Sequence, residues 1–254
     1  MLSKLVFTGE RASMRDKGGI NLARYVYTLT YAKDKAVLEI GFGSGFGAYY
    51  LSQHGVKSVF AIDPDGRAVD FARRNFRAKN LHFQKAKIED LKISRKFDVA
   101  VSFEVIEHLE KPEIMLVKVK KLLKRSGIFL VSTPNRALSS YDGDKPTNPY
   151  HVREYFGDEF YKLLRRYIKY ASVYGIFLKA DKKEKESSIQ KSWRWQLASR
   201  LTKKRWIRRV MNYLPEGPKR LFTGESELNL SPDDFFISYK NSEKAPYFIA
   251  LCKK

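Results

Sequence analysis

The chain has 254 residues, 43% of them hydrophobic, so it is long enough to bury a full core, and we expect a single domain over residues 1–254. Its one cysteine, Cys252, excludes a disulfide framework, and no apolar run reaches the roughly 18 residues of a transmembrane helix, so we expect a cytoplasmic protein, soluble or at most peripheral to a membrane. The formal net charge of +21 favours polyanionic partners such as RNA, anionic lipid or a phosphorylated substrate, although an ordinary basic surface explains much of the excess equally well.

Short β-type runs alternate with amphipathic helical stretches from Lys35 to Ser132. This pattern is typical of a parallel sheet with helices on both faces. Five strands are predicted in this half, namely Ala36–Ile40, Ser58–Ile62, Leu81–Lys85, Val99–Phe103 and Gly127–Ser132. Ligand-binding loops are expected to follow the carboxyl ends of these strands.

The second half of the chain begins with a polar stretch, Arg136 to Asn148, which is predicted to be a long surface loop. A helix over Glu154–Tyr167, a strand over Ile168–Leu178 and a last strand over Tyr247–Cys252 are predicted after it. Seven strands are therefore expected in all.

A basic insertion is predicted between the last two strands, over residues 179–234. Its centre, Ile189–Leu214, has apolar residues at helical spacing on one face and Lys and Arg on the other, with Trp193 on the apolar side. Four interpretations stay open: a peripheral membrane anchor, an RNA-binding helix, a lid over an acceptor site, and an ordinary packed helix.

A glycine-rich run, Glu39-Ile-Gly41-Phe-Gly43-Ser-Gly45-Phe-Gly47, follows the first predicted strand and precedes a helix expected to begin near Ala48. Glycines let the backbone turn sharply and let a ligand lie against the main chain. A dinucleotide fingerprint needs its third glycine three residues after the second, where this chain has Phe46. The spacing therefore argues against a nicotinamide or flavin enzyme.

Four further features accompany the glycine run: Asp63 at the end of the second strand, and the runs Phe97–Leu109, Leu122–Gly127 and Val131–Asn135. In this order and spacing they resemble the class I S-adenosylmethionine-dependent methyltransferases, closely from Lys35 to Asn135. The resemblance implies a Rossmann-like, doubly wound α/β fold whose seven-stranded, mostly parallel sheet has an antiparallel last strand. It also implies S-adenosylmethionine as the cofactor.

The same resemblance implies which residues hold the cofactor. Glu39 is expected near its methionine amino end, and Asp63 is placed to accept both ribose hydroxyls. The full cofactor-binding set is Glu39, Gly41, Gly43, Gly45, Asp63, Ile88 and Phe103. The family often has Asp where Lys87 stands, so the backbone of Ile88 or the side chain of Glu89 is expected to contact the adenine instead.

Methyl transfer from a sulfonium is an in-line displacement, so few side chains need to react. A hydroxyl acceptor requires a base or a metal to remove its proton. His108, Glu104 and His151 are the candidate catalytic residues. A metal alternative stays open, in which Glu104, Glu107, His108 and His151 bind Mg²⁺ or Mn²⁺, similar to the RNA 2′-O-methyltransferases; the ubiquinone-biosynthesis O-methyltransferases also have a Glu-x-x-Glu-His run.

Near the N-terminus, Phe7–Arg11 followed by Arg24-Tyr25 resembles methyltransferases associated with cell-surface glycan synthesis. An Arg and a Tyr there are able to close over the cofactor's carboxylate, or to belong to a helix packed on the sheet edge. We therefore expect O-methylation of a small-molecule, glycan or lipid-linked acceptor. The alternatives are a metal-assisted RNA 2′-O-methyltransferase and a non-catalytic RNA- or membrane-binding module.

Overall fold

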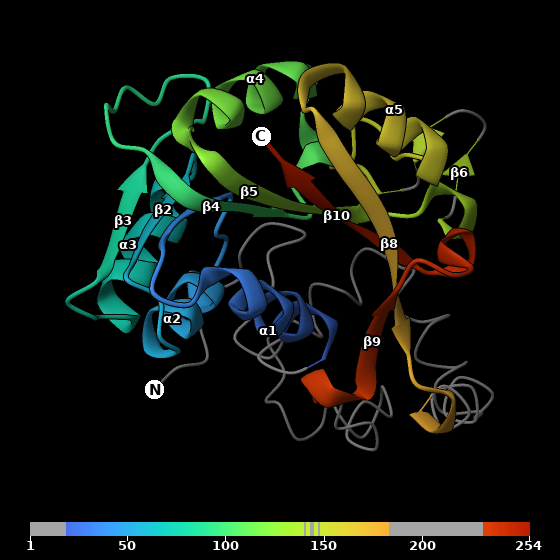
Figure 1. The fold of residues 1–254 in the computed structure, drawn as a ribbon, viewed down its shortest axis with the longest axis horizontal. Coiled ribbons are helices and arrows are strands. Elements are labelled where there is room, and N and C mark those ends of the chain that lie inside the picture. The colour runs from blue at the N-terminus through green and yellow to red at the C-terminus, as the bar shows by residue number, and fades with distance from the viewer. Residues whose placement is uncertain (1–18, 140, 143–144, 147, 183–230) are drawn as a thin grey trace, which may run out of the picture.

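The computed structural model describes residues 19–139, 141–142, 145–146, 148–182 and 231–254. Its centre is one eight-stranded sheet of order β3-β2-β1-β4-β5-β10-β8-β9 (Figure 1). The strands are β1 (Ala36–Ile40), β2 (Ser58–Asp63), β3 (Leu81–Lys85), β4 (Phe97–Phe103), β5 (Leu123–Pro134), β8 (Tyr170–Leu178), β9 (Phe235–Ser238) and β10 (Tyr247–Lys253).

The first five strands pair in parallel, and β10 is antiparallel to both of its neighbours, β5 and β8. This confirms the predicted α/β, Rossmann-like sheet and its seven expected strands. The eighth, β9, was not predicted: its four residues directly follow the segment assigned to the insertion, and no strand was expected before Tyr247. It pairs only with the second half of β8, from Gly175 to Leu178.

Helices cover the sheet on both faces (Figure 1). On one side lie α1 (Ile20–Ala32), α2 (Phe46–Gln53) and α3 (Gly66–Asn75), and on the other α4 (Pro112–Leu122) and α5 (Gly157–Tyr167). Each layer has its own apolar cluster. Leu38 and Ile40 of β1 belong to the cluster under α4 and α5, whereas Val37 belongs to the cluster under α2 and α3. The central strand is thus buried on both faces, as a parallel strand between two helical layers must be.

Some boundaries differ from the prediction. The expected loop over Arg136–Asn148 contains a short helical turn, η3 (Arg136–Leu138), and a small hairpin of β6 (Tyr141–Asp142) and β7 (Lys145–Pro146). The helix expected from Glu154 begins at Gly157.

The predicted basic helix over residues 189–214 and the lead-in over residues 7–11 lie outside the described residues. At the base of the predicted insertion, the amide of Lys179 donates to the carbonyl of Asp234 over 2.8 Å, which joins its two ends beside β8 and β9. In the part of the chain that is described, no helix has both the length and the apolar composition to cross a membrane.

Candidate functional site

The glycine loop connects β1 to α2 at the carboxyl edge of the sheet. Gly41 and Gly45 have φ angles of +74° and +81°, a region that side chains other than glycine rarely adopt. Space is also restricted, because a Cβ on Gly41 would lie 2.4 Å from Cγ2 of Val105. The loop therefore needs glycine both for its turn and for the close approach of the neighbouring strand's end.

Asp63 ends β2 directly beside this loop, and its side chain is buried. Its Oδ2 accepts a hydrogen bond from the amide of Gly43 over 2.9 Å, and its Oδ1 accepts one from the amide of Asp65, also over 2.9 Å. These two bonds hold the carboxylate in one orientation. The structure thus brings Asp63 and the glycine loop together, as their positions after neighbouring parallel strands predict.

Glu39 lies on β1 just before the loop and is fully buried. Its Oε1 accepts a hydrogen bond from the hydroxyl of Tyr25 over 2.6 Å, whereas its buried Oε2 has no hydrogen-bond partner among the described residues. Burial raises the pKa of Glu39 to about 7; the Tyr25 bond lowers that pKa, and the nearby charge of Asp63 raises it. A buried carboxylate with an unpaired oxygen suits a cationic group such as an ammonium.

Ile88 and Phe103, the two apolar residues of the predicted cofactor-binding set, differ in how far their side chains are buried. Ile88 follows β3 and is buried in the core on the α4 side, so only its backbone is a candidate for ligand contact. Phe103 ends β4, is partly buried, and meets the ring of Tyr25 edge-on with 5.3 Å between ring centroids. Lys87 and Glu89 are exposed.

Glu104 follows β4 with a φ angle of +55°, which is uncommon for a residue with a side chain. Its Oε1 accepts a hydrogen bond from the hydroxyl of Ser132 over 2.7 Å and lies 3.0 Å from Nη2 of Arg24, within ion-pair distance although outside hydrogen-bond geometry. The Arg24 side chain, on α1, is only 2% exposed. Glu104 therefore joins α1 to the ends of β4 and β5.

Glu107 lies in η2 (Ile106–His108), and its side chain is completely buried. Its Oε2 accepts a hydrogen bond from the hydroxyl of Thr133 over 3.2 Å, and its Oε1 has no partner among the described residues. Burial raises the pKa of Glu107 well above its usual range, and the neighbouring Glu104 raises it further. The backbone carbonyl of Glu107 accepts hydrogen bonds from the amides of Val152 and Arg153, which fixes the segment that carries His151.

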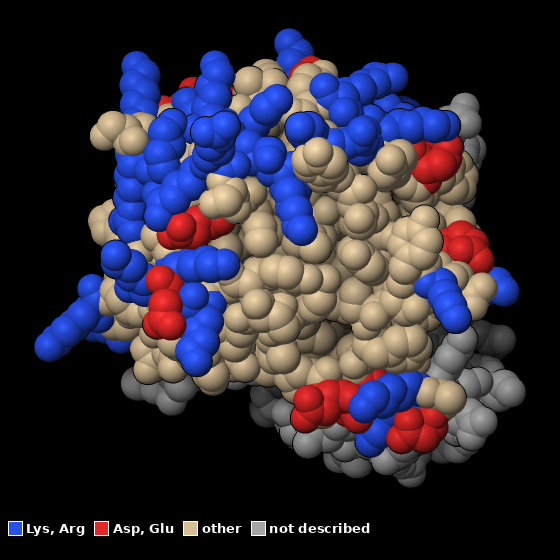
Figure 2. All heavy atoms as spheres, viewed as in Figure 1, with Lys and Arg blue, Asp and Glu red and all other residues tan. Residues whose placement is uncertain are grey.

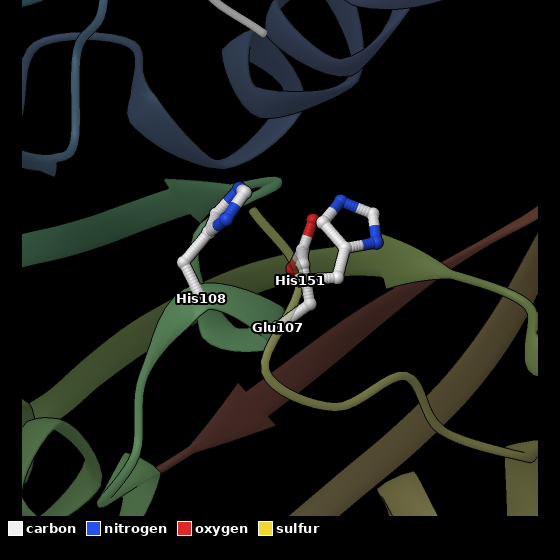
Figure 3. A group of neighbouring side chains, drawn as sticks. All are labelled: Glu107, His108 and His151. Atoms are coloured by element: carbon white, nitrogen blue, oxygen red, sulfur yellow. The ribbon is translucent and has the colours of Figure 1, made fainter. Parts of the chain in front are cut away.

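The rings of His108 and His151 meet nearly at right angles with 5.0 Å between their centroids, and both side chains extend to the same side as Glu107 (Figure 3). Nδ1 of His108 lies 2.8 Å from the carbonyl oxygen of Tyr150, which accepts and never donates, so this nitrogen carries the proton of the neutral ring. Nε2 is then the nitrogen of His108 that can accept a proton.

Both ring nitrogens of His151 contact neighbouring side chains. Nδ1 makes a short contact with a carboxylate oxygen of Glu154, and Nε2 lies 3.0 Å from the amide nitrogen of Asn148. Because the amide nitrogen donates, Nε2 accepts, and Nδ1 carries the proton toward Glu154. His151 therefore braces the loop before α5 and does not cap the helix itself.

The predicted four-residue metal set is only partly assembled. Ligand atoms of Glu107, His108 and His151 lie within 4.8 Å of one another, but Glu104 does not belong to this group. Glu104 does not share a helical turn with Glu107 and His108, since it precedes η2, and its side chain lies beside Arg24.

Several residues of the site were not predicted from the sequence. Ser132, Thr133, Asn148 and Glu154 all contact predicted site residues. Ser132 and Thr133 gave a usable signal, because they are polar residues at the carboxyl end of a predicted buried strand. Asn148 and Glu154 each lie three residues from His151, but no residue pattern indicates the turn that brings these side chains together. Tyr25 was expected near the cofactor, whereas its hydrogen bond to Glu39 depends on how α1 packs.

Comparisons with known proteins agree with this geometry. Residues 38–131 match the family described as a methyltransferase domain. A probable S-adenosylmethionine-dependent methyltransferase of Mycobacterium tuberculosis is 36% identical over 129 residues, which cover 50% of this chain and 46% of the relative. The ubiquinone biosynthesis O-methyltransferase of Haemophilus ducreyi is 32% identical over 133 residues, covering 48% of this chain and 56% of the relative. The chain thus spans about half the length of the curated relatives it matches.

Among solved structures, an S-adenosylmethionine-dependent methyltransferase of Thermotoga maritima, described as a possible histamine N-methyltransferase, superposes with a TM-score of 0.59. The alignment covers 92% of this chain and 88% of that one at 18% identity, so the likeness concerns the fold. The glycine loop, Asp63 and Glu39 all lie within or beside the matched residues 38–131. Residues 38–131 thus form a methyltransferase domain, and a relative that matches this part of the chain is named as S-adenosylmethionine-dependent.

Proposed function

We propose that this protein transfers the methyl group of S-adenosylmethionine to a hydroxyl oxygen of a small-molecule acceptor, a glycan or a lipid-linked intermediate. The observation that carries the cofactor assignment is the pairing of the glycine loop with two buried carboxylates, Glu39 and Asp63. The name of the ubiquinone biosynthesis O-methyltransferase of Haemophilus ducreyi supports oxygen as the acceptor atom.

The residues at the loop fit this cofactor chemically. The unpaired buried oxygen of Glu39 suits the amino group of the cofactor's methionine end. At Gly43 no atom lies within 4 Å of the position that a Cβ would take, which leaves room for a ligand against the main chain. The amide of Gly43 orients Asp63 toward the loop. The backbone of Ile88 and the ring of Phe103 complete the proposed cofactor-binding set.

S-adenosylmethionine supplies an electrophilic methyl group on a sulfonium. The protein's part is to align the acceptor oxygen with that methyl, to exclude water, and to take up the proton that the hydroxyl loses. Nε2 of His108 is the proposed proton acceptor, because its Nδ1 proton is held by the carbonyl of Tyr150. Glu104 and His151 are proposed positioning residues, which brace the two sides of the acceptor pocket.

The proposal is tested by incubating the protein with methyl-labelled S-adenosylmethionine and fractionated cell extract. Label is expected in the lipid or carbohydrate fraction, in a bond that resists mild base, as an ether does. Label found only in protein or in RNA would contradict the proposed acceptor class and leave the cofactor assignment standing.

A second candidate function, metal-assisted RNA 2′-O-methylation, is favoured by the cluster of Glu107, His108 and His151. One carboxylate and two histidines are ligands that Mn²⁺ accepts, and a bound cation would stabilise the ionised form of buried Glu107. Against it, both nitrogens of His151 already have side-chain partners, so metal binding requires Glu154 or Asn148 to release one of them. Turnover that stops on chelation and returns with Mn²⁺ would support this candidate, and turnover insensitive to chelators would exclude it.

The domain organisation follows as part of the same proposal. Residues 1–254 form one methyltransferase domain, and residues 179–234 are a basic insertion within it. The helix proposed at residues 189–214 is available for contact with a membrane surface, which would bring a cytoplasmic enzyme to a lipid-linked acceptor. Deleting the insertion between Lys179 and Asp234, whose backbones are hydrogen-bonded, is expected to reduce membrane recovery without unfolding the sheet.

A further inference from the structure

A hollow lined by tyrosines and cations lies away from the glycine loop, where α5 meets the beginning of β8 and the end of β10. Its volume is about 470 Å³. Three tyrosines line it, Tyr161 from α5 and Tyr170 and Tyr174 from β8, together with Arg165 and Lys253. None of its lining residues is acidic.

The sheet register explains why Tyr170, Tyr174 and Lys253 lie together, and α5 adds Tyr161 and Arg165 at the edge of the sheet. Lys253 pairs with Tyr170 across β10 and β8, and Tyr170 and Tyr174 point to the same face because side chains alternate along a strand. β9 pairs with β8 only from Gly175 onward, so within the described residues no strand covers the outer edge at Tyr170–Tyr174. Tyr161 and Tyr170 are 43% and 54% exposed, so part of each side chain is accessible to a ligand.

Further cations flank the hollow. Nζ of Lys169 lies 5.1 Å from the centre of the Tyr170 ring. On the other side, Lys254 follows Lys253, and its amide donates to the carbonyl of Gly127, close to exposed Arg125. Lys and Arg also gather on the side of the molecule that carries α4 and α5, where few acidic residues interrupt them (Figure 2).

We infer that this hollow binds single-stranded nucleic acid, with bases stacked on Tyr161 and Tyr170 and phosphates at Arg165 and Lys253. Every base has a face that stacks on tyrosine, and every nucleotide has a phosphate, so alternating rings and cations suit this polymer. A membrane surface fits less well, because interfacial anchors project Trp, Phe or Leu outward, whereas these tyrosines line a concave surface. A second copy of this chain would meet the repulsion of two molecules of net charge +21.

The hollow is separate from the methyl-transfer site. The glycine loop and Asp63 lie at the carboxyl ends of β1 and β2, whereas Lys253 pairs with Ile128, near the beginning of β5, and with the first residue of β8. The inference therefore does not depend on the proposed function. Loss of nucleic-acid binding at the hollow would leave cofactor binding intact.

The test is fluorescence anisotropy of the full chain with a labelled, unstructured RNA of about 12 nucleotides. The pair Tyr161→Ala and Tyr170→Ala is expected to weaken binding about tenfold or more, whereas Tyr161→Phe with Tyr170→Phe retains the rings and the binding. The pair Arg165→Glu and Lys253→Glu is expected to weaken binding and to reduce the salt dependence, the slope of log K against log salt, by roughly 1.4.

The matched control reverses the charge of two exposed lysines, Lys57 before β2 and Lys79 before β3, near the opposite edge of the sheet. The pair Lys57→Glu with Lys79→Glu changes the net charge by the same amount. This control is expected to retain most of the binding, and all variants are checked for an unchanged melting temperature and unchanged S-adenosylmethionine binding. No binding by the wild-type chain, or equal losses in the control pair and the hollow pair, would overturn the inference.

Two competition arms distinguish other ligands. Free uridine monophosphate that displaces the RNA at equal nucleotide concentration would indicate a mononucleotide pocket and overturn strand binding. Vesicles of anionic phospholipid that bind the wild-type chain but not the Tyr161→Ala, Tyr170→Ala pair, with no RNA binding, would assign the hollow to a membrane surface instead. If neither uridine monophosphate nor the vesicles displace the RNA, the result supports a site for an extended strand.

Discussion

At the residue scale, Glu39 is held in an unfavourable state that a ligand can relieve. Its carboxylate is fully buried and has a pKa of about 7. Near neutral pH, folding therefore costs free energy, either because Glu39 must take up a proton or because a negative charge is buried. One oxygen already accepts the hydroxyl proton of Tyr25. A cationic group at the other oxygen would lower this cost, which links binding to stability.

The first prediction concerns Glu39→Gln. Because the folded pKa of Glu39 exceeds its unfolded value of 4.5, the folded state binds more protons between these values, and the unliganded wild-type chain loses stability as pH rises from about 4.5 through 7. The variant lacks this loss, so above pH 7 it should be more stable than wild type by about 2 to 3 kcal/mol, and equally stable near pH 4.5. Urea unfolding at pH 5 and pH 8 measures the difference, and parallel pH profiles of the two proteins would contradict the account.

The same variant should bind S-adenosylmethionine more weakly, since its amide presents no charge to an ammonium group. Tighter or unchanged binding in Glu39→Gln, measured by calorimetry, would remove Glu39 from the cofactor site. Tyr25→Phe is the companion variant: it removes the hydrogen bond to Glu39 and keeps the carboxylate.

A second prediction concerns His108, the proposed proton acceptor. His108→Ala should lower kcat by about 10² to 10⁴ and leave the KM for S-adenosylmethionine unchanged, because the ring acts on the acceptor and not on the cofactor. His54→Ala, at an exposed histidine following α2, is the matched control and should retain full activity. A loss confined to the KM for the cofactor would instead place His108 in the cofactor pocket.

At the scale of elements, the glycine loop gives the sharpest test of local geometry. Gly41→Ala meets two obstacles, a φ of +74° and the Cγ2 atom of Val105 at 2.4 Å, whereas Gly55→Ala meets only a φ of +79° with no atom within 4 Å. Gly55→Ala should therefore cost about 1 to 2 kcal/mol of stability, and Gly41→Ala distinctly more, together with lost cofactor affinity. Denaturation of both variants checks this.

The steric part of that prediction can be isolated. Adding Val105→Ala to Gly41→Ala removes the clashing methyl group and should restore part of the lost stability. Equal stability of Gly41→Ala and Gly55→Ala, or no recovery in the double variant, would show that the loop has more room than the geometry implies.

The elements themselves were largely predictable. Strands buried on both faces appear in the sequence as largely apolar runs, and in β1 only Glu39 interrupts the run. The positions of Asp63 and the glycine loop follow from the rule that ligands lie at the carboxyl ends of parallel strands. β9 was missed because four residues at a sheet edge carry too little pattern to predict. Nothing local in the sequence indicates the left-handed backbone of Glu104, or that its side chain lies beside Arg24, a residue 80 positions earlier.

At the scale of the whole molecule, the fold joins distant segments around one edge of the sheet. α1 contributes Arg24 and Tyr25, β4 leads to Glu104 and η2, and the loop before α5 brings His151 against His108. Spacing along the chain predicts that β4 and the glycine loop meet, but not how the loop around His151 docks. That docking depends on amides of Val152 and Arg153 reaching the carbonyl of Glu107.

The whole-molecule arrangement also divides the surface by function. The cofactor residues and the two histidines lie around the carboxyl edge of the sheet, and the cations and exposed tyrosines of α5, β8 and β10 lie toward the other end of the strands. The proposed strand-binding surface of this basic chain, whose net charge is +21, thus lies apart from the proposed methyl-transfer site.

The central claim is that the glycine loop, Glu39 and Asp63 form a working S-adenosylmethionine site. Calorimetric titration of the purified chain with S-adenosylmethionine tests it most directly. The account predicts saturable binding at one site per chain, in the micromolar range, that Gly41→Ala abolishes and Gly55→Ala preserves. Absence of saturable binding by the folded wild-type chain, or equal binding by Gly41→Ala, would contradict it.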